Sequence, residues 1–299
     1  MAFHSAGLPS IGIFTESTDR SMPIVDLAIA IENRGFTGLF VNEHTHIPIA
    51  HDRSRFPADP KGEIPERYAR FLDPYVALAF VAARTNLEVG PMVSLVAEHD
   101  AIALAKATAT LDLLSSGRLL LGVGFGWNRE EFEDHGLPAN VRADVVEETV
   151  LLIRRLWSDE VASFSGVYRS LSPSRSWPKP VQKPNPPVLL GAPASLRNFE
   201  RIVRWADGWA PMASPVFEPV FADWINDLRH RWTDAGRDPS SLQLMSLLTT
   251  IRSEDLPRAI ERLAELGVQR AAVRIAEGDA VATERRLDRA ASALAPIYA

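Results

Sequence analysis

Short apolar runs alternate with longer segments of helical periodicity, and this alternation occurs eight times along the sequence. The runs predicted as strands cover residues 11–14, 38–41, 87–95, 119–123, 187–190, 208–210, 242–251 and 271–275. The segments predicted as helices cover residues 23–34, 74–83, 101–114, 141–157, 195–205, 216–235, 256–266 and 280–294. Alternating strands and helices favour a parallel sheet with right-handed crossovers. Eight such units predict an α/β fold of the (β/α)8 TIM barrel type, which typically needs roughly 250 residues. We expect residues 1–299 to form one such domain.

Two segments do not fit the eight-unit pattern. Residues 45–73 form a long polar connection after the second strand, and residues 158–186 form an insertion between the fourth helix and the fifth strand. Within the insertion, residues 162–168 predict a short β-hairpin around a glycine turn. Loops this long inside one domain are usually lids or binding loops.

The composition excludes several classes of protein. The chain has no cysteine, which excludes disulfides, cysteine-ligated zinc and thiol nucleophiles. Its net charge of -6 argues against nucleic-acid binding. No apolar run approaches the roughly 20 residues of a membrane span, and the first residues do not resemble a signal peptide. We therefore expect a cytoplasmic protein that acts on a small-molecule substrate and binds neither nucleic acid nor a membrane.

The predicted helix at residues 101–114 is rich in alanine and leucine on more than one face. Such a surface on an outer helix indicates a subunit interface, and we expect a homodimer. The alternative is that these small residues only allow close packing between helices.

Catalytic residues of such barrels lie where the strands end and the following loops begin. The second predicted strand is followed by Glu43 and His44. A histidine exchanges a proton near neutral pH, and a neighbouring carboxylate can orient its ring. We therefore predict His44 as a proton donor or acceptor with Glu43 as its orienter. The alternative is that His44 only caps the top of the barrel in a satisfied network.

A metal site is a second interpretation of the same segment. His44 and His46 form a His-x-His pair, and His51 and His99 are further candidate ligands. Zinc hydrolases built on barrels normally carry this pair on the first strand, whereas here one strand precedes it. We therefore predict no metal and keep a metal-dependent hydrolase as the less favoured alternative.

Two glycine-containing turns are candidate anion sites. Gly122, Gly124 and Gly126 follow one another at alternate positions where the fourth strand ends, although the same spacing also suits tight packing. Residues 191–195 follow the fifth strand and open a helix, whose N–H groups and Ser195 hydroxyl would face a ligand. The alternative for Ser195 is an ordinary helix N-cap.

Several stretches, in order, resemble one known family. They are residues 112–128 (DLLSSGRLLLGVGFGWN), 130–136 (EEFEDHG), 177–182 (WPKPVQ), 186–191 (PPVLLG) and 204–209 (RWADGW). The chain resembles the luciferase-like monooxygenases, and in particular their coenzyme F420-dependent oxidoreductase branch. The resemblance spans about residues 10–280.

The resemblance implies a (β/α)8 barrel with an insertion and a flavin or deazaflavin cofactor at the carboxyl ends of the strands. It places His44 beside the reactive part of the ring and a non-prolyl cis peptide near residues 92–94. The residues that it implies for cofactor binding are Met92, Val93, Ser94, Gly124, Phe125, Gly126, Trp127, Asn128, Gly191, Ala192, Ala194 and Ser195.

The sequence departs from the family pattern at two turns. Glu98, His99 and Asp100 stand where many members have Arg-His-Pro or Arg-His-Asn, so an anion contact by the arginine is lost. Pro193 follows Gly191 and Ala192 where the family often has Gly-Gly-x, which removes one N–H donor.

The function expected from these observations is hydride transfer between coenzyme F420 and a small organic substrate. The first alternative is an FMN-dependent luciferase-like monooxygenase that uses O2. The metal-dependent hydrolase and a cofactor carrier without catalytic activity are the remaining alternatives.

Overall fold

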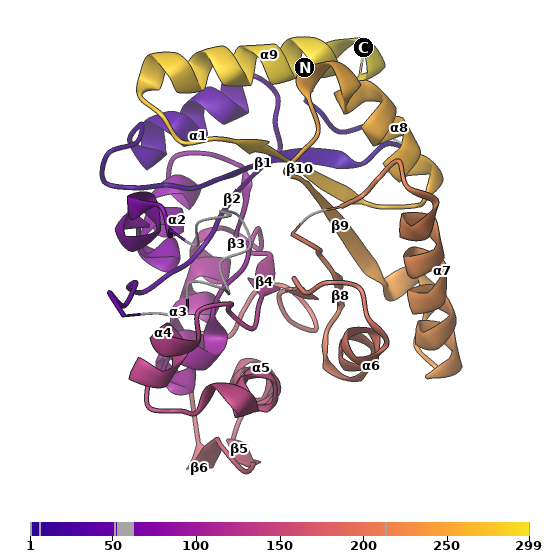
Figure 1. Cartoon of the computed structure of the whole chain (residues 1–299). Helices are drawn as coiled ribbons and strands as arrows, with labels where there is room; N and C mark the ends of the chain where they lie inside the picture. Colours follow the sequence, from indigo (N-terminus) through magenta and orange to yellow (C-terminus); the bar gives the residue numbers. More distant parts are fainter. Residues whose placement is uncertain (1, 6, 51, 53–62, 213, 299) are drawn as a thin grey trace.

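Eight parallel strands surround the centre of the molecule (Figure 1). The computed structural model describes residues 2–5, 7–50, 52, 63–212 and 214–298. In order of pairing, the strands are β3 (Glu88–Pro91), β2 (Gly38–Val41), β1 (Ser10–Thr15), β10 (Arg270–Ile275), β9 (Gln243–Leu248), β8 (Gly208–Trp209), β7 (Val188–Leu190) and β4 (Leu121–Val123). Each neighbouring pair is parallel. The predicted (β/α)8 barrel is therefore confirmed.

Two isolated parallel bridges between the first and last strands of this order close the barrel. Val89 pairs with Leu119, and Ser94 pairs with Val123. The first strand advances five residues between the bridges while its partner advances four, so one extra residue bulges out of β3. The bulge lies at the carboxyl end of the barrel, where the loops begin.

Helices cover the outside of the barrel (Figure 1). The longer ones are α1 (Ile24–Asn33), α2 (Pro74–Ala82), α3 (Ala101–Leu114), α5 (Arg142–Ser158), α6 (Leu196–Trp205), α7 (Pro219–Asp234), α8 (Leu256–Glu265) and α9 (Ala280–Tyr298). Shorter turns of helix are η2 (Glu66–Arg70), η3 (Val96–Glu98), α4 (Arg129–Asp134), η4 (Ala139–Val141), η5 (Pro239–Ser241) and η6 (Ser253–Asp255). Within the described ranges, no helix is both long enough and apolar enough to cross a membrane.

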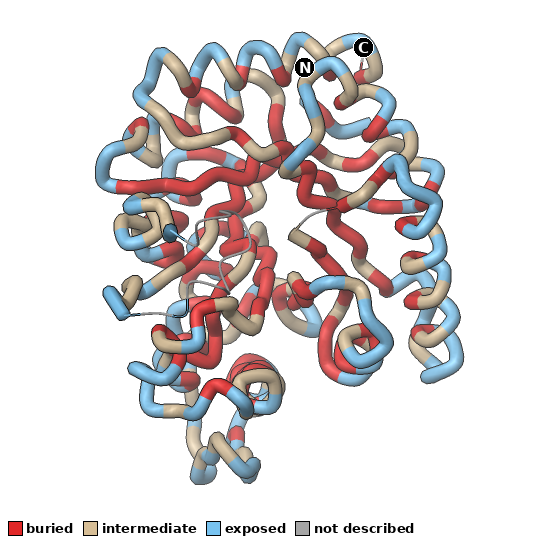
Figure 2. The backbone as a smooth tube through the Cα atoms, in the orientation of Figure 1, coloured by how far each residue is buried: buried red, intermediate tan, exposed pale blue. Residues whose placement is uncertain are grey.

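The interior of the barrel is packed with side chains and is not a channel. Figure 2 shows the buried residues concentrated along the strands and on the inner sides of the helices. The cluster inside the barrel contains Phe14, Phe40, Met92, Leu120, Leu189, Ala210, Met245, Leu247 and Ala272. A larger apolar layer separates the strands from the helices. This packing leaves the ends of the barrel as the places where a ligand can bind.

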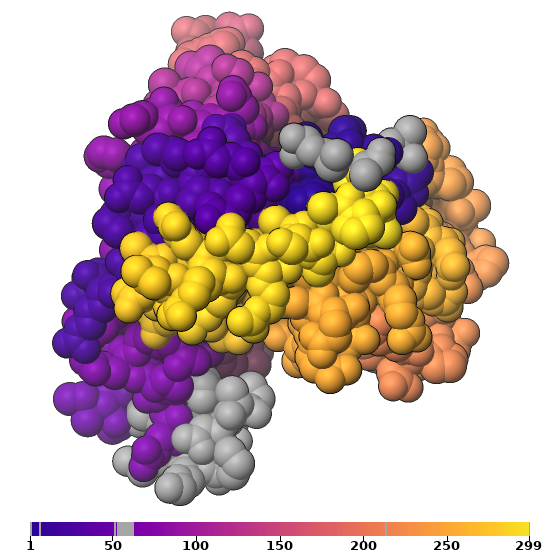
Figure 3. All heavy atoms as spheres, turned by 90° about the horizontal axis from the view of Figure 1, so that it is seen from above, coloured from indigo at the N-terminus to yellow at the C-terminus, as the bar shows by residue number. Residues whose placement is uncertain are grey.

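The last helix joins the two ends of the chain. Seen from above, α9 crosses the molecule as a continuous band (Figure 3), and it packs against α1 and α8. The hydroxyl of Tyr298 donates a hydrogen bond to the carbonyl of Pro9, just before β1. The helix α9 therefore covers the junction between the first and the last strand–helix units of the barrel.

The insertion after α5 forms the predicted hairpin. Its strands β5 (Ala162–Ser165) and β6 (Ser170–Ser174) pair antiparallel below α5 (Figure 1). Glu148 of α5 accepts hydrogen bonds from the N–H groups of Val167, Tyr168 and Arg169, at 2.7 to 2.8 Å. One carboxylate therefore fixes the turn of the hairpin against the helix.

Several predicted boundaries were wrong. The third strand ends at Pro91 and not at residue 95, because the bulge interrupts its pairing. The sixth helix begins at Pro219 and not at residue 216, because proline suits the first turn of a helix. The helix α4 was not predicted, since six residues are too few to give a clear apolar period.

Gly90 is a position where a side chain would interfere with barrel closure. A Cβ atom there would overlap the backbone carbonyl of Leu120, just before β4. We expect G90A to destabilise the protein by more than about 3 kcal/mol, because backbone cannot move aside as a flexible side chain can. Thermal denaturation followed by circular dichroism measures this.

The control for G90A is G136A, at a glycine with a φ of 87° and no atom within 4 Å of the added Cβ. In this variant the alanine must adopt a left-handed backbone conformation, which should lower the free energy of unfolding by about 1 kcal/mol. Equal effects of the two substitutions would contradict the role of Gly90 in closure.

Candidate active site

His44 lies at the carboxyl end of β2 in a nearly closed polar and aromatic site. Its side chain is 6% exposed. The Nδ1 atom is 2.6 Å from Oε2 of Glu131 on α4, and Nε2 accepts a hydrogen bond from the indole N–H of Trp127 at 3.0 Å. The rings of Tyr68, Phe71 and Trp127 pack around the imidazole, with centroids 5.4 to 5.8 Å away. A ligand that reaches His44 therefore meets one imidazole and an aromatic wall.

The segment that carries Tyr68 is anchored over the barrel by ion pairs. Arg67 of η2 donates to the buried Glu16 after β1 at 2.9 Å, and Arg274 of β10 contacts the same carboxylate at 3.2 Å. Arg67 also lies over the ring of Tyr68. These contacts hold η2 across the ends of β1 and β10 and place Tyr68 against His44.

A groove at the same rim, with a volume of about 420 Å³, lies between η2 and the loops after β1 and β10. It is lined by Thr18, Arg20, Ser21, Pro65, Glu66, Arg67, Arg70, Glu277, Gly278 and Asp279.

Glu43 does not orient His44, and that prediction was wrong. Its carboxylate accepts hydrogen bonds from the hydroxyl of Ser94 at 2.8 Å and the N–H of Leu95 at 2.6 Å, and it contacts Nε2 of His99 at 2.7 Å. Successive side chains of an extended chain point to opposite sides. Glu43 therefore faces the β3 bulge while His44 faces α4.

His99 and Tyr75 complete the network around Glu43. Burial favours the neutral imidazole of His99, but the hydrogen bond and the charge of Glu43 outweigh burial and raise the pKa of His99. Tyr75 donates to the Ser94 hydroxyl at 2.7 Å, and burial raises the pKa of Tyr75. This network ties the bulge to α2 and to the end of β2.

Glu98 is a third buried carboxyl group beside Glu43 and Glu131. Burial raises the pKa of Glu98 to about 9, and the negative charges of Glu131 and Glu43 add to the effect. Its Oε2 atom has no hydrogen-bond partner within the described residues, and Nε2 of His135 is 3.8 Å away. Glu98 is therefore a neutral acid at pH 7, at a position where the resemblance led us to look for an arginine.

The β3 bulge explains the glycines at the ends of two neighbouring strands. The peptide bond between Met92 and Val93 is cis, as expected near residues 92–94. A Cβ atom at Gly124 or Gly191 would overlap the side chain of Val93, and one at Gly122 would overlap the sulfur of Met92. These three glycines give room to the bulge, and for Gly122 and Gly124 this agrees with the packing alternative.

The turn before α6 is built around a helix cap. The Ser195 hydroxyl accepts the N–H of Asn198 at 3.2 Å, which is the N-cap alternative. Ala192 is buried, and its carbonyl accepts the indole N–H of Trp209 at 2.9 Å. Ala194 packs at the edge of the core. The first turn of a helix leaves N–H groups without partners inside the helix, and such groups can bind an anion.

Phe125 and Asn128 lie in the segment that joins β4 to α4. The Arg201 guanidinium of α6 lies over the ring of Phe125, 5.1 Å from its centroid. Asn128 caps α4 through Oδ1, which accepts the N–H groups of Glu130 and Glu131 at 3.2 Å.

Unpartnered polar atoms gather around the mouth of the barrel. Within the described part of the chain, the buried atoms Oγ of Ser17, Oδ1 of Asn42, Nδ2 of Asn128 and Oγ of Ser214 have no hydrogen-bond partner. These residues follow β1, β2, β4 and β8. Buried polar atoms without partners are costly in a folded protein, so this rim suits a ligand with a polar edge.

Sequence reasoning missed Glu131, Tyr68 and Phe71. Glu131 lies in the stretch at residues 130–136 that carried the resemblance, but nothing in the sequence showed that it meets His44. Tyr68 and Phe71 lie in the long connection after β2, which contains no recognisable motif.

The described histidines that were candidate metal ligands form hydrogen bonds to other side chains. His46 contacts Asp134 at 3.0 Å and the Thr45 hydroxyl at 2.9 Å, while His99 is held by Glu43. No group of three or more metal-ligating side chains converges within the described ranges. His51 lies outside them.

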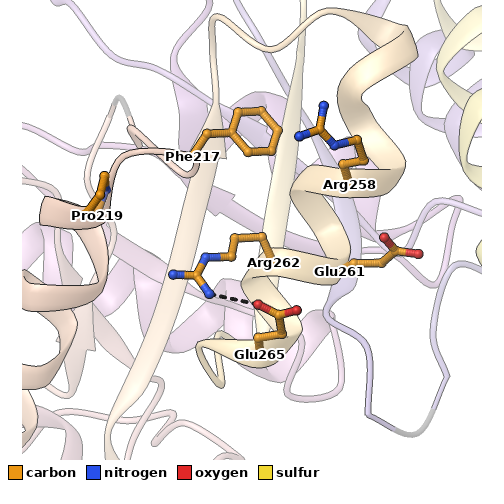
Figure 4. A pocket seen from close by; sticks show the side chains of 6 residues that line it. All are labelled: Phe217, Pro219, Arg258, Glu261, Arg262 and Glu265. Atoms are coloured by element: carbon orange, nitrogen blue, oxygen red, sulfur yellow. Dashed lines mark hydrogen bonds and ion pairs between the residues drawn. The ribbon is translucent and has the colours of Figure 1, made fainter.

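A second groove, also of about 420 Å³, lies on the outer surface between the start of α7 and α8 (Figure 4). Arg262 pairs with Glu265 at 2.8 Å, and Arg258 lies over the ring of Phe217. It holds none of the residues around His44.

Comparison with protein families gives one match over nearly the whole chain. The model described as luciferase-like monooxygenase matches residues 3–296. An uncharacterized protein of Mycobacterium tuberculosis is 39% identical over 261 residues, which are 86% of this chain and 88% of that protein. The F420-dependent hydroxymycolic acid dehydrogenase of the same organism is 29% identical over 198 residues, 64% of this chain and 52% of that enzyme.

Solved structures share the fold at low sequence identity. The coenzyme F420-dependent tetrahydromethanopterin reductase of Methanopyrus kandleri has a TM-score of 0.72 at 15% identity, covering 98% of this chain and 100% of that chain. The monooxygenase RslO1 of Streptomyces bottropensis has a TM-score of 0.71 at 19% identity, covering 97% and 100%. At these identities the likeness shows the barrel fold.

Replacing Glu98 by Gln is expected to make stability less dependent on pH. The folded protein keeps the Glu98 proton up to about pH 9, whereas an ordinary glutamate loses it near 4.5. The folded state therefore holds an extra proton between these values, and stability falls as pH rises through this window. At pH 8, E98Q should exceed the wild type by about 4 to 5 kcal/mol in free energy of unfolding, at roughly 1.4 kcal/mol per pH unit above 4.5, and the gain should shrink toward pH 5.

Urea denaturation at both pH values measures this difference. The matched control is E133Q, which removes an exposed carboxylate of α4. A gain for E98Q that is the same at pH 5 and pH 8 would contradict the buried neutral acid.

Proposed function

The chain belongs to the luciferase-like monooxygenase family, whose members are oxidoreductases, and we propose that it transfers a hydride between coenzyme F420 and a small organic substrate. The observation that carries this proposal is the placement of His44. It lies at the carboxyl end of the barrel, inside an aromatic wall, and beside a rim of unpartnered polar atoms. The F420-dependent dehydrogenase among the relatives supports the choice of cofactor.

The residues around the mouth fit a planar cofactor with a polar edge. The β3 bulge at Met92, Val93 and Ser94 would form one wall, because Val93 stands at the barrel mouth against the glycines of β4 and β7. Asn42 and Asn128 each present a buried polar atom without a partner among the described residues.

The remaining contacts would come from the segments after β4 and β7. Gly124, Phe125, Gly126 and Trp127 would border the ring, and the turn at Gly191, Ala192, Ala194 and Ser195 would receive an anionic group at the start of α6. When bound, a deazaflavin supplies a ring carbon that accepts or donates a hydride.

His44 would handle the proton that accompanies the hydride. Oxidation of a hydroxyl group releases one hydride from carbon and one proton from oxygen, and reduction of a carbonyl group takes up both. An imidazole at the mouth suits this exchange near neutral pH. The substrate class that we propose is a small molecule carrying a hydroxyl or carbonyl group.

Fluorescence titration of the protein with F420 and with FMN tests the cofactor. We expect tighter binding of F420, and turnover with a panel of small secondary alcohols or ketones. H44Q should bind F420 nearly as tightly as the wild type but turn over at least about 100-fold more slowly, because it lacks the proton-exchanging group. Tighter binding of FMN, with oxygen consumption, would favour the monooxygenase alternative.

The wild type also tests the two remaining alternatives. Binding of F420 without turnover of any substrate would favour the carrier. Stoichiometric zinc without affinity for either cofactor would favour the hydrolase.

We also propose that two copies of the chain pair through α2 and α3. The side chains of Val76, Phe80, Ile102 and Leu114 on these adjacent helices are 45 to 66% exposed. The sequence of α2 has no charged residue, so two identical faces would meet without repulsion between like charges. A second copy of this chain is therefore the partner that suits this face.

Phe80 is 63% exposed and offers the clearest test of this interface. We expect the wild type to sediment as a dimer and F80E to sediment as a monomer, because the variant would place two buried carboxylates opposite each other. The control is V281E, at a valine of α9 that is 66% exposed. A monomeric wild type, or a dimer unaffected by F80E, would contradict the proposal.

A further inference from the structure

The hydrogen bonds of His44 define where its proton lies. The indole N–H of Trp127 can only donate, so Nε2 of His44, at 3.0 Å, must accept. The carboxylate of Glu131 can accept from Nδ1 at 2.6 Å. A neutral imidazole has one donor and one acceptor nitrogen, and both contacts are satisfied when the proton is on Nδ1.

Glu131 is itself held in one orientation. Its side chain is 1% exposed. Its second oxygen, Oε1, accepts the N–H of Thr45 at 2.8 Å and lies 3.3 Å from the Thr45 hydroxyl. The N–H of Glu131 is bonded to the side chain of Asn128, which caps α4. The carboxylate therefore cannot turn away from His44 without losing these contacts.

We propose that Glu131 is a positioning residue that keeps the proton of His44 on Nδ1, so that Nε2 is the atom that exchanges a proton with the substrate. Trp127 occupies Nε2 until a substrate hydroxyl replaces the indole N–H as its donor. This inference rests on the proposed function in one respect, namely that the substrate reaches His44.

The proton balance of the step follows from this arrangement. When a hydroxyl substrate is oxidised, its O–H proton would pass to Nε2 as the carbonyl group forms, and a bound oxidised deazaflavin would supply the acceptor for the C–H hydride. The Nδ1 proton stays in its hydrogen bond to Glu131, and the negative charge of Glu131 compensates the imidazolium. In the reverse direction Nε2 returns the proton to the carbonyl oxygen as the hydride arrives.

The test uses the ligand-free protein with 15N-labelled histidine, because nitrogen chemical shifts separate the two neutral tautomers. The His44 signals are assigned by their loss in H44Q. We expect the wild type to show Nδ1–H and unprotonated Nε2. In E131Q the Thr45 N–H keeps the amide oxygen as its acceptor, so the amide N–H faces Nδ1 as a donor. The proton should then move to Nε2, and the hydrogen bond from Trp127 should be lost. The matched control E133Q changes an exposed glutamate of the same helix and should leave the His44 signals unchanged.

Two results would overturn the inference, and neither requires a cofactor. One is a wild-type protein in which Nε2 carries the proton. The other is a folded E131Q with the tautomer of the wild type. If E131Q does not fold, the wild-type spectrum and that of E131D decide, and E131D should keep the proton on Nδ1.

Kinetics with F420 and the substrate found by screening provide a second readout. E131Q should lower kcat about 100-fold with little change in KM, because the substrate still binds but meets the wrong tautomer, and E131D should recover part of the loss. An equal loss in E133Q would overturn the positioning role. Failure of F420 to bind would contradict the proposed function but would leave the tautomer result standing.

Discussion

Hydrogen bonding between β3 and β4 across a one-residue bulge is the constraint on which the rest of the molecule depends. Without the bridges at Val89 and Ser94, the eight strands would form an open sheet with two unpaired edges. Closure creates the packed interior around Met92 and Met245 and brings all strand ends to one mouth. The extra residue also places Val93 against Gly124 and Gly191, the glycines that directly follow β4 and β7. The same local irregularity therefore completes the barrel and shapes the surface that would face a cofactor.

The sequence was sufficient for the fold because the fold depends on local patterns. The strand at Gly38–Val41 and the helix at Ala101–Leu114 were predicted with their observed bounds, since apolar periodicity and flanking glycines are local signals. Boundaries were wrong where a distant contact decides them. The third strand stops at Pro91 because its partner on β4, about 30 residues later, accommodates a bulge.

The site was only partly predictable because its contacts join distant segments. His44 and residues 92–94 were predicted as site residues from the sequence, but the partner of His44 is Glu131, 87 residues away in the sequence. Glu43 was assigned to His44 because the two are adjacent, whereas an extended chain sends neighbouring side chains to opposite sides. The result is two separate Glu–His pairs, Glu43 with His99 and Glu131 with His44, where one was expected.

Within the described part of the chain, the two hydrogen-bond partners of the His44 ring, Trp127 and Glu131, lie within five consecutive residues. Trp127 precedes α4, Asn128 caps it, and Glu131 lies in its first turn. A displacement of this short helix from the barrel would therefore remove the donor at Nε2 and the acceptor at Nδ1 together. Exposure of the imidazole to solvent and loss of its preferred tautomer would then be one event. Movement of the loop after β4 and the proton chemistry at the end of β2 are in this way mechanically coupled.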